Sequence, residues 1–217
     1  MLSGLQLERL AGASTAHGGL FSTPDLAVLL DRPDPPRLGE AARRLIRDGI
    51  LFRIRRGLYV DRLHGYRPEI LGQRWVGPSY LSTESALDRY ELCQTGVAAY
   101  TYVTTRLLAG RARAVRVLDG HRFVYRHVRP HLFFGFRPED GLWIADPEKA
   151  VIDFLYFFKK GQRSAVSPKE IAAEKLDGQR FCRYLRRYRQ RGFERYALAW
   201  LAERGITSAR RKHSAGR

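Results

Sequence analysis

The chain has 217 residues, enough for one large domain or two small ones, and its 44% hydrophobic and 28% charged residues are ordinary for a globular protein. No apolar run approaches the roughly 18 residues that span a bilayer, residues 1–19 lack the order of a secretory signal, and two cysteines make no disulfide framework, so we expect a cytoplasmic protein without membrane contact. The formal net charge of +17 instead indicates a polyanionic partner.

Residues 1–65 are predicted to form three short helices and a hairpin, the order of a winged helix-turn-helix domain. The first helix ends in the glycine-containing segment 12–19. The second begins at Ser22, where a hydroxyl can cap free backbone amides and Pro24 suits the first turn.

The third helix, over residues 36–48, is amphipathic. Its apolar stripe at helical spacing consists of Leu38, Ala41, Ala42, Leu45 and Ile46. That stripe leaves four basic residues on the outward side, namely Arg37, Arg43, Arg44 and Arg47. Residues 50–60 then predict two strands around a turn at Gly57, where glycine tolerates a positive φ.

This basic helix and hairpin are the predicted DNA-binding site, because residues 36–60 hold 7 arginines against 2 acids. A helix can enter the major groove, where arginine reads guanine, and a basic wing beside it can reach phosphates or the minor groove. The wing residues are Arg53, Arg55 and Arg56. The alternative is that these arginines are an ordinary solvated surface.

Residues 66–78, rich in glycine and proline, predict a linker to a mixed α/β domain over residues 79–207 with a small antiparallel-type sheet and C-terminal helices. Ser82 or Thr83 is expected to cap its first helix, and Asp119-Gly120 predicts a hairpin turn. The predicted strands cover residues 99–105, 115–118, 121–128, 132–136 and 142–145. The fold class is therefore α+β.

A helix is expected to start at Asp146, with this aspartate as its cap, and Asp153 is expected to pair with Lys149 on the helix surface. The tail is predicted to be helical, ending in a basic disordered segment at residues 208–217. Residues 179–217 hold 12 basic and 2 acidic side chains. A secondary contact to nucleic-acid phosphates is expected at Arg180, Arg183, Arg186 and Arg187.

No enzymatic site stands out. The sequence lacks a glycine-rich phosphate loop, an HExxH motif and a G-x-S-x-G motif. His121, His127 and His131 lie close together, but their β-like setting and Pro130 do not suit the spacing of metal ligands. We therefore expect neither catalytic residues nor a metal or cofactor.

Three segments resemble the AbiEi-type antitoxins of type IV toxin–antitoxin, or abortive-infection, systems. They are residues 43–49 with 52–59, residues 80–82 with 85–87, and residues 145–150 with 153–156, within a region of about 20–160. After Ser85-Ala86-Leu87 this chain reads Arg89-Tyr90-Glu91, where the family tends to show Tyr-His-Gly. The sequence beyond residue 160 matches no motif of the family.

The resemblance implies an antitoxin that represses its own operon by binding inverted repeats in duplex DNA, as a dimer or as cooperating monomers. It also implies a toxin with a nucleotidyltransferase fold that is countered without a stable complex. Two alternatives remain. One is a stand-alone regulator with a ligand-sensing second domain, and the other is an RNA-binding protein that uses the C-terminal arginine-rich helix.

Overall fold

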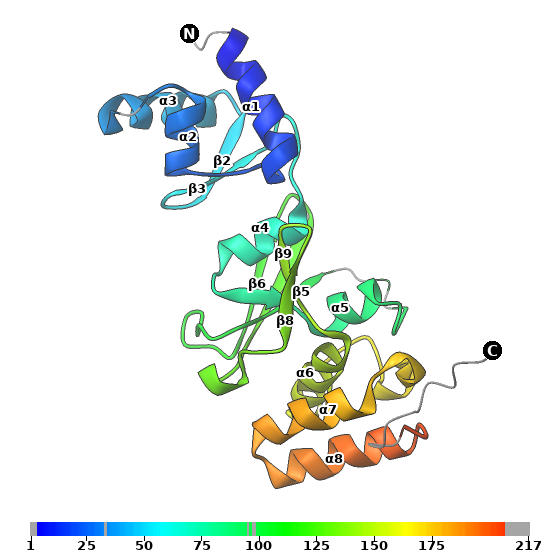
Figure 1. The fold of residues 1–217 in the computed structure, drawn as a ribbon. Helices are drawn as coiled ribbons and strands as arrows, with labels where there is room; N and C mark the ends of the chain where they lie inside the picture. The colour runs from blue at the N-terminus through cyan, green and yellow to red at the C-terminus, as the bar shows by residue number, and fades with distance from the viewer. Residues whose placement is uncertain (1–3, 33, 95, 97–98, 207–217) are drawn as a thin grey trace, which may run out of the picture. The chain divides into compact units, whose positions relative to one another are not determined.

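The computed structural model describes residues 4–32, 34–94, 96 and 99–206 and is divided into two compact units, Met1–Trp75 and Val76–Arg217. The described residues form eight α-helices and nine strands, an α+β fold as predicted (Figure 1). The expected disordered segment 208–217 lies outside the described residues. In the described part of the chain, no helix has both the length and the apolar character needed to cross a membrane.

The first unit consists of four helices and a small antiparallel sheet. Its elements are α1 (Gly4–His17), β1 (Leu20–Ser22), α2 (Thr23–Leu29), α3 (Pro35–Arg47), β2 (Leu51–Arg55), β3 (Leu58–Asp61) and α4 (Pro68–Trp75). The strand order is β1-β3-β2, so the β2–β3 hairpin is extended by β1. Sequence patterns predicted the hairpin but not β1, because three residues are too short to show an alternating pattern.

The predicted starts and turns of this unit are confirmed. Ser22 caps α2 through a reciprocal capping box with Asp25, and Gly57 adopts a φ of 75° between β2 and β3. The core gathers one face of each of the first three helices with β1 and β2. Its buried residues are Leu10, Phe21, Leu26, Leu30, Leu38, Leu45 and Leu51.

The segment 66–78, expected to be a linker, contains α4, and the division between the units falls at Trp75. Ile70 and Leu71 of this helix are buried. Of the glycines and prolines that predicted a linker, Pro68 and Gly72 lie within the helix, and Gly77 and Pro78 follow it. Pro68 is at the first position, where proline suits a helix start.

The second unit is built on one mixed sheet. Its strands and α-helices are β4 (Ser79–Leu81), α5 (Thr83–Arg89), β5 (Tyr100–Thr104), β6 (Arg113–Leu118), β7 (His121–His127), β8 (Phe136–Glu139), β9 (Leu142–Ala145), α6 (Pro147–Lys159), α7 (Gly178–Leu185) and α8 (Arg191–Ala202). The strand order is β6-β7-β5-β4-β9-β8, with β5 parallel to β7 and β4 parallel to β9. The expected small antiparallel-type sheet is thus corrected to a six-stranded mixed one.

Two local predictions about this sheet have different outcomes. Asp119 and Gly120 form the turn between β6 and β7 with positive φ values of 47° and 79°, as predicted. The strand expected at 132–136 is wrong. Residues 130–132 form a short 3₁₀ helix, Gly135 has a φ of 72°, and β8 begins only at Phe136.

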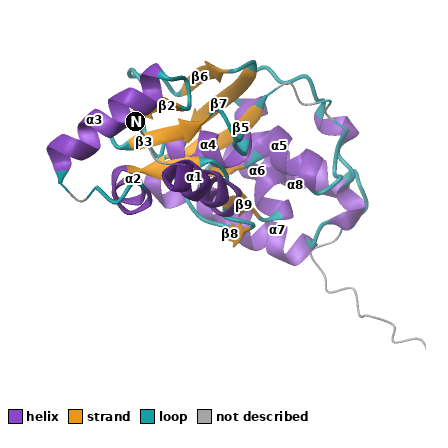
Figure 2. Ribbon diagram, turned by 90° about the horizontal axis from the view of Figure 1, so that it is seen from above, coloured by secondary structure: helices purple, strands orange, loops and turns teal. Residues whose placement is uncertain are grey.

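Helices cover this sheet and contact each other. Contacts join α5 to β5 and to α6, and α6 to β9, α7 and α8 (Figures 1 and 2). The aromatic side of the tail helices is buried, as the helical spacing predicts, with Phe181, Leu185, Phe193 and Trp200 at most 4% exposed. The tail was predicted to be helical, but residues Pro168–Glu170 form only a single 3₁₀ turn, closed by a capping box between Ser167 and Glu170.

Candidate nucleic-acid interface

The outward face of α3 forms a basic hollow of about 510 Å³. All four predicted arginines of this helix line it, together with one further arginine and one acid. The lining residues are Arg32, Arg37, Glu40, Ala41, Arg43, Arg44 and Arg47. This lining is hereafter called the α3 hollow.

The amphipathic sequence of α3 fixes this arrangement. Leu38, Ala42 and Leu45 are buried in the core of the first unit, so the intervening arginines are exposed. Asp34 caps the helix by accepting the backbone N–H of Arg37 at 3.4 Å, and its carboxylate lies 3.7 Å from the Arg37 guanidinium. Arg37 is therefore partly neutralised at the start of the helix.

The other arginines of α3 are not neutralised within the described residues. No ion pair or side-chain hydrogen bond to a described residue occupies Arg43, Arg44 or Arg47. Glu40 has helical spacing to Arg43 and Arg44, yet it also makes no ion pair in the described part of the chain. The α3 hollow therefore presents guanidinium groups that are free to meet an anionic ligand, with one carboxylate among them.

The three arginines of the hairpin are exposed, but they differ in their hydrogen bonds. Arg55 donates through Nη2 to the carbonyl of Arg74 at 3.4 Å and through Nη1 to that of Arg56 at 3.3 Å. Its guanidinium is thus held by the C-terminal end of α4. Arg53 and Arg56 make no such contact to a described residue, so the hairpin offers two uncommitted arginines rather than three.

The four arginines of the predicted secondary contact, on α7 and the turn after it, also differ in their contacts. Arg180 lies 3.6 Å from the carboxylate of Glu148, and the Arg187 guanidinium stacks 3.8 Å from the ring centre of Phe134. Arg183 and Arg186 are exposed and make no ion pair with a described residue. Arg183 lies over the ring of Tyr184, at 5.9 Å from its centre, so Arg186 is the one of the four that makes neither an ion pair nor a ring contact with a described residue.

The pair of Lys149 and Asp153 is buried, which corrects the expectation of a surface ion pair. Both side chains are fully inaccessible and in hydrogen-bond contact. Residues 148–157 of α6 are all buried, so this helix lacks the solvated face that the helical spacing assumed. Charges at helical spacing predict that two side chains meet, but they do not show whether water reaches them.

Asp153 also organises the surrounding hydroxyl groups. It accepts hydrogen bonds from Tyr80 and Ser82, both at 2.9 Å, and from Tyr188 at 2.5 Å. Burial lowers the pKa of Lys149, although the charge of Asp153 opposes this. The Ser82 hydroxyl is therefore committed to Asp153, and the side-chain cap expected from it at the start of α5 is not made.

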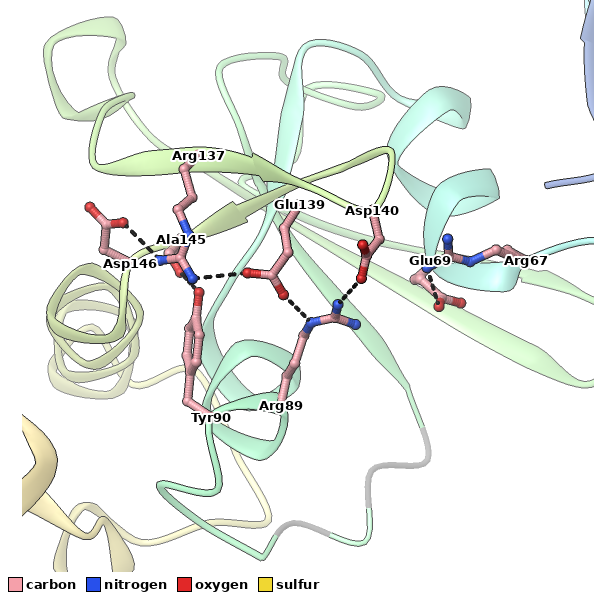
Figure 3. Close-up of polar contacts among 9 residues, drawn as sticks. All are labelled: Arg67, Glu69, Arg89, Tyr90, Arg137, Glu139, Asp140, Ala145 and Asp146. Atoms are coloured by element: carbon pink, nitrogen blue, oxygen red, sulfur yellow. Dashed lines mark hydrogen bonds and ion pairs between the residues drawn. The ribbon is translucent and has the colours of Figure 1, made fainter. Parts of the chain in front are cut away.

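Asp146 is likewise not a side-chain cap, which corrects a second expectation. It accepts from the Tyr184 hydroxyl at 2.6 Å and from Arg137 at 3.3 Å. In Figure 3 this ion pair continues through Glu139, which Arg137 and Arg89 both contact at 2.9 Å. Hydrogen bonding from Arg89 lowers the pKa of Glu139.

Two of the three segments quoted for the resemblance, residues 80–82 with 85–87 and residues 145–150 with 153–156, contact each other in the second unit. Tyr80 and Ser82 of one segment contact Asp153 of another. Tyr90 donates to the carbonyl of Ala145 at 2.9 Å (Figure 3), and burial raises the pKa of Tyr90 to about 12. Arg89 and Tyr90 stand where the chain departs from the family pattern, and both bind the β8–β9 hairpin.

The three histidines do not form a ligand set. Within the described residues, no group of three or more His, Cys, Asp or Glu side chains is arranged to hold a metal ion. His121 instead lies beside the ring of Tyr100, with 5.9 Å between ring centres.

Sequence reasoning missed the two charged members of the α3 hollow other than the predicted arginines, and it placed Ala41, which also lines the hollow, on the apolar stripe. Arg32 lies in the turn between α2 and α3, and its position just before a predicted recognition helix was the available signal. Glu40 was visible as the acid on the arginine face of the helix. Comparison with models of known protein families and with curated proteins found no match to this chain.

Proposed function

We propose that the first unit is a winged-helix module that binds duplex DNA sequence-specifically, with α3 in the major groove and the β2–β3 hairpin as the wing. The observation that carries this proposal is the α3 hollow, in which four arginines of one helix and Arg32 face the solvent. Arginine can donate two hydrogen bonds to guanine O6 and N7, and a helix fits the major groove. The order α1-β1-α2-α3-β2-β3 and the three-stranded sheet support it further.

We propose in addition that the protein is the antitoxin and autorepressor of a type IV toxin–antitoxin operon. The resemblance of three segments to AbiEi-type antitoxins supports this second step. Two of these segments contact each other around Asp153, as expected if they preserve one structural unit. The partner is then operator DNA, with a nucleotidyltransferase-like toxin countered without a stable complex, in the cytoplasm.

The DNA-binding proposal is tested by fluorescence anisotropy on the DNA upstream of the gene and on a scrambled duplex of equal length. Phosphate contacts alone do not discriminate sequence, so we expect the upstream duplex to bind roughly a thousandfold more tightly at physiological salt. Arg44→Ala with Arg47→Ala should abolish this ratio. Arg9→Ala, which removes an exposed arginine of α1, is the control and should retain it. Equal binding of both duplexes by the unaltered protein would contradict the proposal.

The antitoxin proposal has a separate test in growth. A neighbouring gene for a nucleotidyltransferase-like protein should arrest growth when expressed alone, and co-expression of this chain should restore it. Restoration without co-purification of the two proteins is the expected result. If no neighbouring gene is toxic, or if this chain fails to restore growth, the stand-alone regulator becomes the better interpretation.

A further inference from the structure

A second basic hollow lies in the second unit, where α6 ends and α8 begins. Its volume is about 340 Å³, and its lining includes Lys159, Lys160 and Arg191 but no carboxylate. It is distinct from the predicted secondary contact, because none of the four arginines named there lines it. We call it the α8 hollow.

The lysines of the α8 hollow contact aromatic rings rather than carboxylates. Lys159 lies 4.9 Å from the ring centre of Tyr196, and Lys160 lies 4.3 Å from that of Tyr156. Within the described residues, neither lysine nor Arg191 forms an ion pair. An aromatic face attracts an ammonium group without replacing its hydrogen-bond acceptors, so these groups keep donors for a ligand.

Backbone and hydroxyl donors line the same hollow. The N-cap of the 12-residue helix α8 is Gln190, whose side chain makes no capping hydrogen bond, and the exposed Gly192 has open space where a side chain would begin. Tyr156 is only 5% exposed, lines the hollow and makes no hydrogen bond through its hydroxyl with any described residue. The hydroxyl is therefore free to donate a hydrogen bond to a ligand in the hollow.

We propose that the α8 hollow binds the phosphoryl group of a nucleotide or of a nucleic-acid strand. Ammonium, guanidinium, amide and hydroxyl donors together match the oxygens of a phosphoryl group, and the start of α8 adds positive potential. The volume is at the lower end of pockets that hold small ligands. Tyr156 and Phe193 are buried against other rings, so no base stacks on them and no base preference is expected.

The lysines also lie at the C-terminal end of α6, where cations stabilise a helix without any ligand. The two roles differ in what a ligand does. A purely structural role predicts that removing the lysines lowers stability and leaves anion binding unchanged, whereas the proposal predicts that binding itself weakens. This site does not depend on the proposed operator binding.

The test is an amide NMR titration of the full chain carrying Arg43→Ala, Arg44→Ala and Arg47→Ala, which removes the competing α3 hollow. The probes are inorganic phosphate, AMP and a mixed-sequence single-stranded 12-mer. We expect saturable shifts of the Arg191 and Gly192 amides. Adding Lys159→Ala and Lys160→Ala should weaken the affinity about tenfold or more, equivalent to about 1.4 kcal/mol. The control pair Lys169→Ala and Lys175→Ala should leave it unchanged.

The probes distinguish the source of the phosphoryl group. A free nucleotide is indicated if AMP binds more tightly than phosphate and at least as tightly as the 12-mer, and a strand is indicated if the 12-mer binds most tightly. The proposal is overturned if no probe shifts these amides, or if the shifts persist unchanged in the folded Lys159→Ala, Lys160→Ala variant. Binding of phosphate alone at high concentration, with no gain from AMP or the 12-mer, overturns it as well and leaves an adventitious ion only.

Discussion

Asp153 joins several elements in the interior of the second unit. It is fully buried, pairs with Lys149 and accepts hydrogen bonds from three hydroxyl groups. A buried carboxylate is tolerated only when its partners offset the loss of water. Several elements thereby converge on one side chain, with Tyr80 from β4, Ser82 from the start of α5 and Tyr188 from the turn after α7.

Asp153→Asn should therefore destabilise the second unit by about 3–5 kcal/mol, because it leaves the Lys149 ammonium buried without an anionic partner. Chemical denaturation followed by tryptophan fluorescence measures the loss. The exposed Glu174→Gln removes one negative charge without burial and should change stability by less than about 0.5 kcal/mol. A similar small effect for both variants would show that the buried pair is dispensable.

Glu84 and Arg126 form a second buried pair, with 2.6 Å between the carboxylate and the guanidinium. Burial raises the pKa of Glu84, but the charge of Arg126 and hydrogen bonds to the carboxylate outweigh it, so the pKa is below its ordinary value of 4.5. In the unfolded chain, a glutamate carboxyl group has a pKa of about 4.3. The stabilisation is thus complete above that pH and is lost as the pH falls through the lower folded pKa.

Glu84→Gln should consequently destabilise the protein at pH 7, and the difference from the unaltered protein should shrink as the pH falls below about 4. Denaturation midpoints for both proteins between pH 7 and pH 3 measure this. The exposed Glu174→Gln variant is the control. A difference that grows on acidification would show that the carboxylate is not held in its charged form.

At the scale of elements, local signals were sufficient where the cause of a structure is itself local. The boundaries of α3, the Gly57 and Asp119-Gly120 turns and the cap of α2 follow from residues within a few positions of each other. The strands β1 and β4 were missed because three residues carry no periodicity. Their strand character depends on partners distant in sequence, such as Val60 opposite Leu20 and Tyr102 opposite Leu81.

The candidate site follows the same division. The arginines of α3 were predictable because a single helix places them together on its exposed face. The hydrogen bond from Arg55 to the carbonyl of Arg74 was not, because Arg74 belongs to α4, in a segment that was expected to be a linker. The α8 hollow was not predictable, since it joins the end of α6 to the start of α8 across about thirty residues. Burial of Lys149 and Asp153 also required the tertiary fold.

The capping box of α2 gives a prediction at this scale. Ser22 accepts the N–H of Asp25 through its side chain, while the Asp25 carboxylate accepts the N–H of Ser22 at 2.7 Å. Ser22→Ala should cost about 0.5–2 kcal/mol of stability in the first unit. Thr15→Ala, an exposed substitution within α1, should be neutral within about 0.5 kcal/mol. Thermal unfolding of the two variants compares them, and an unchanged midpoint for Ser22→Ala would show that the cap contributes nothing.

For the whole molecule, the basic residues that would bind the proposed polyanion are distributed over both units. Residues 179–217 hold 12 basic and 2 acidic side chains, yet the arginine-lined hollow lies on α3. Deleting the C-terminal residues would not separate these contributions. Phe181, Leu185 and Trp200 are buried, so the deletion would remove much of the core of the second unit along with its charge.

Exposed arginines can be removed instead. Arg183→Ala with Arg186→Ala should weaken binding to the upstream and scrambled duplexes equally, and the slope of log affinity against log salt should fall by about 1 for each phosphate that the variant no longer neutralises. Arg43→Ala with Arg44→Ala should instead abolish the preference for the upstream duplex. Anisotropy across a salt series measures both quantities. If the first pair abolishes binding while the second has no effect, the polyanion is held by the second unit, and RNA binding replaces operator recognition as the better account of its charge.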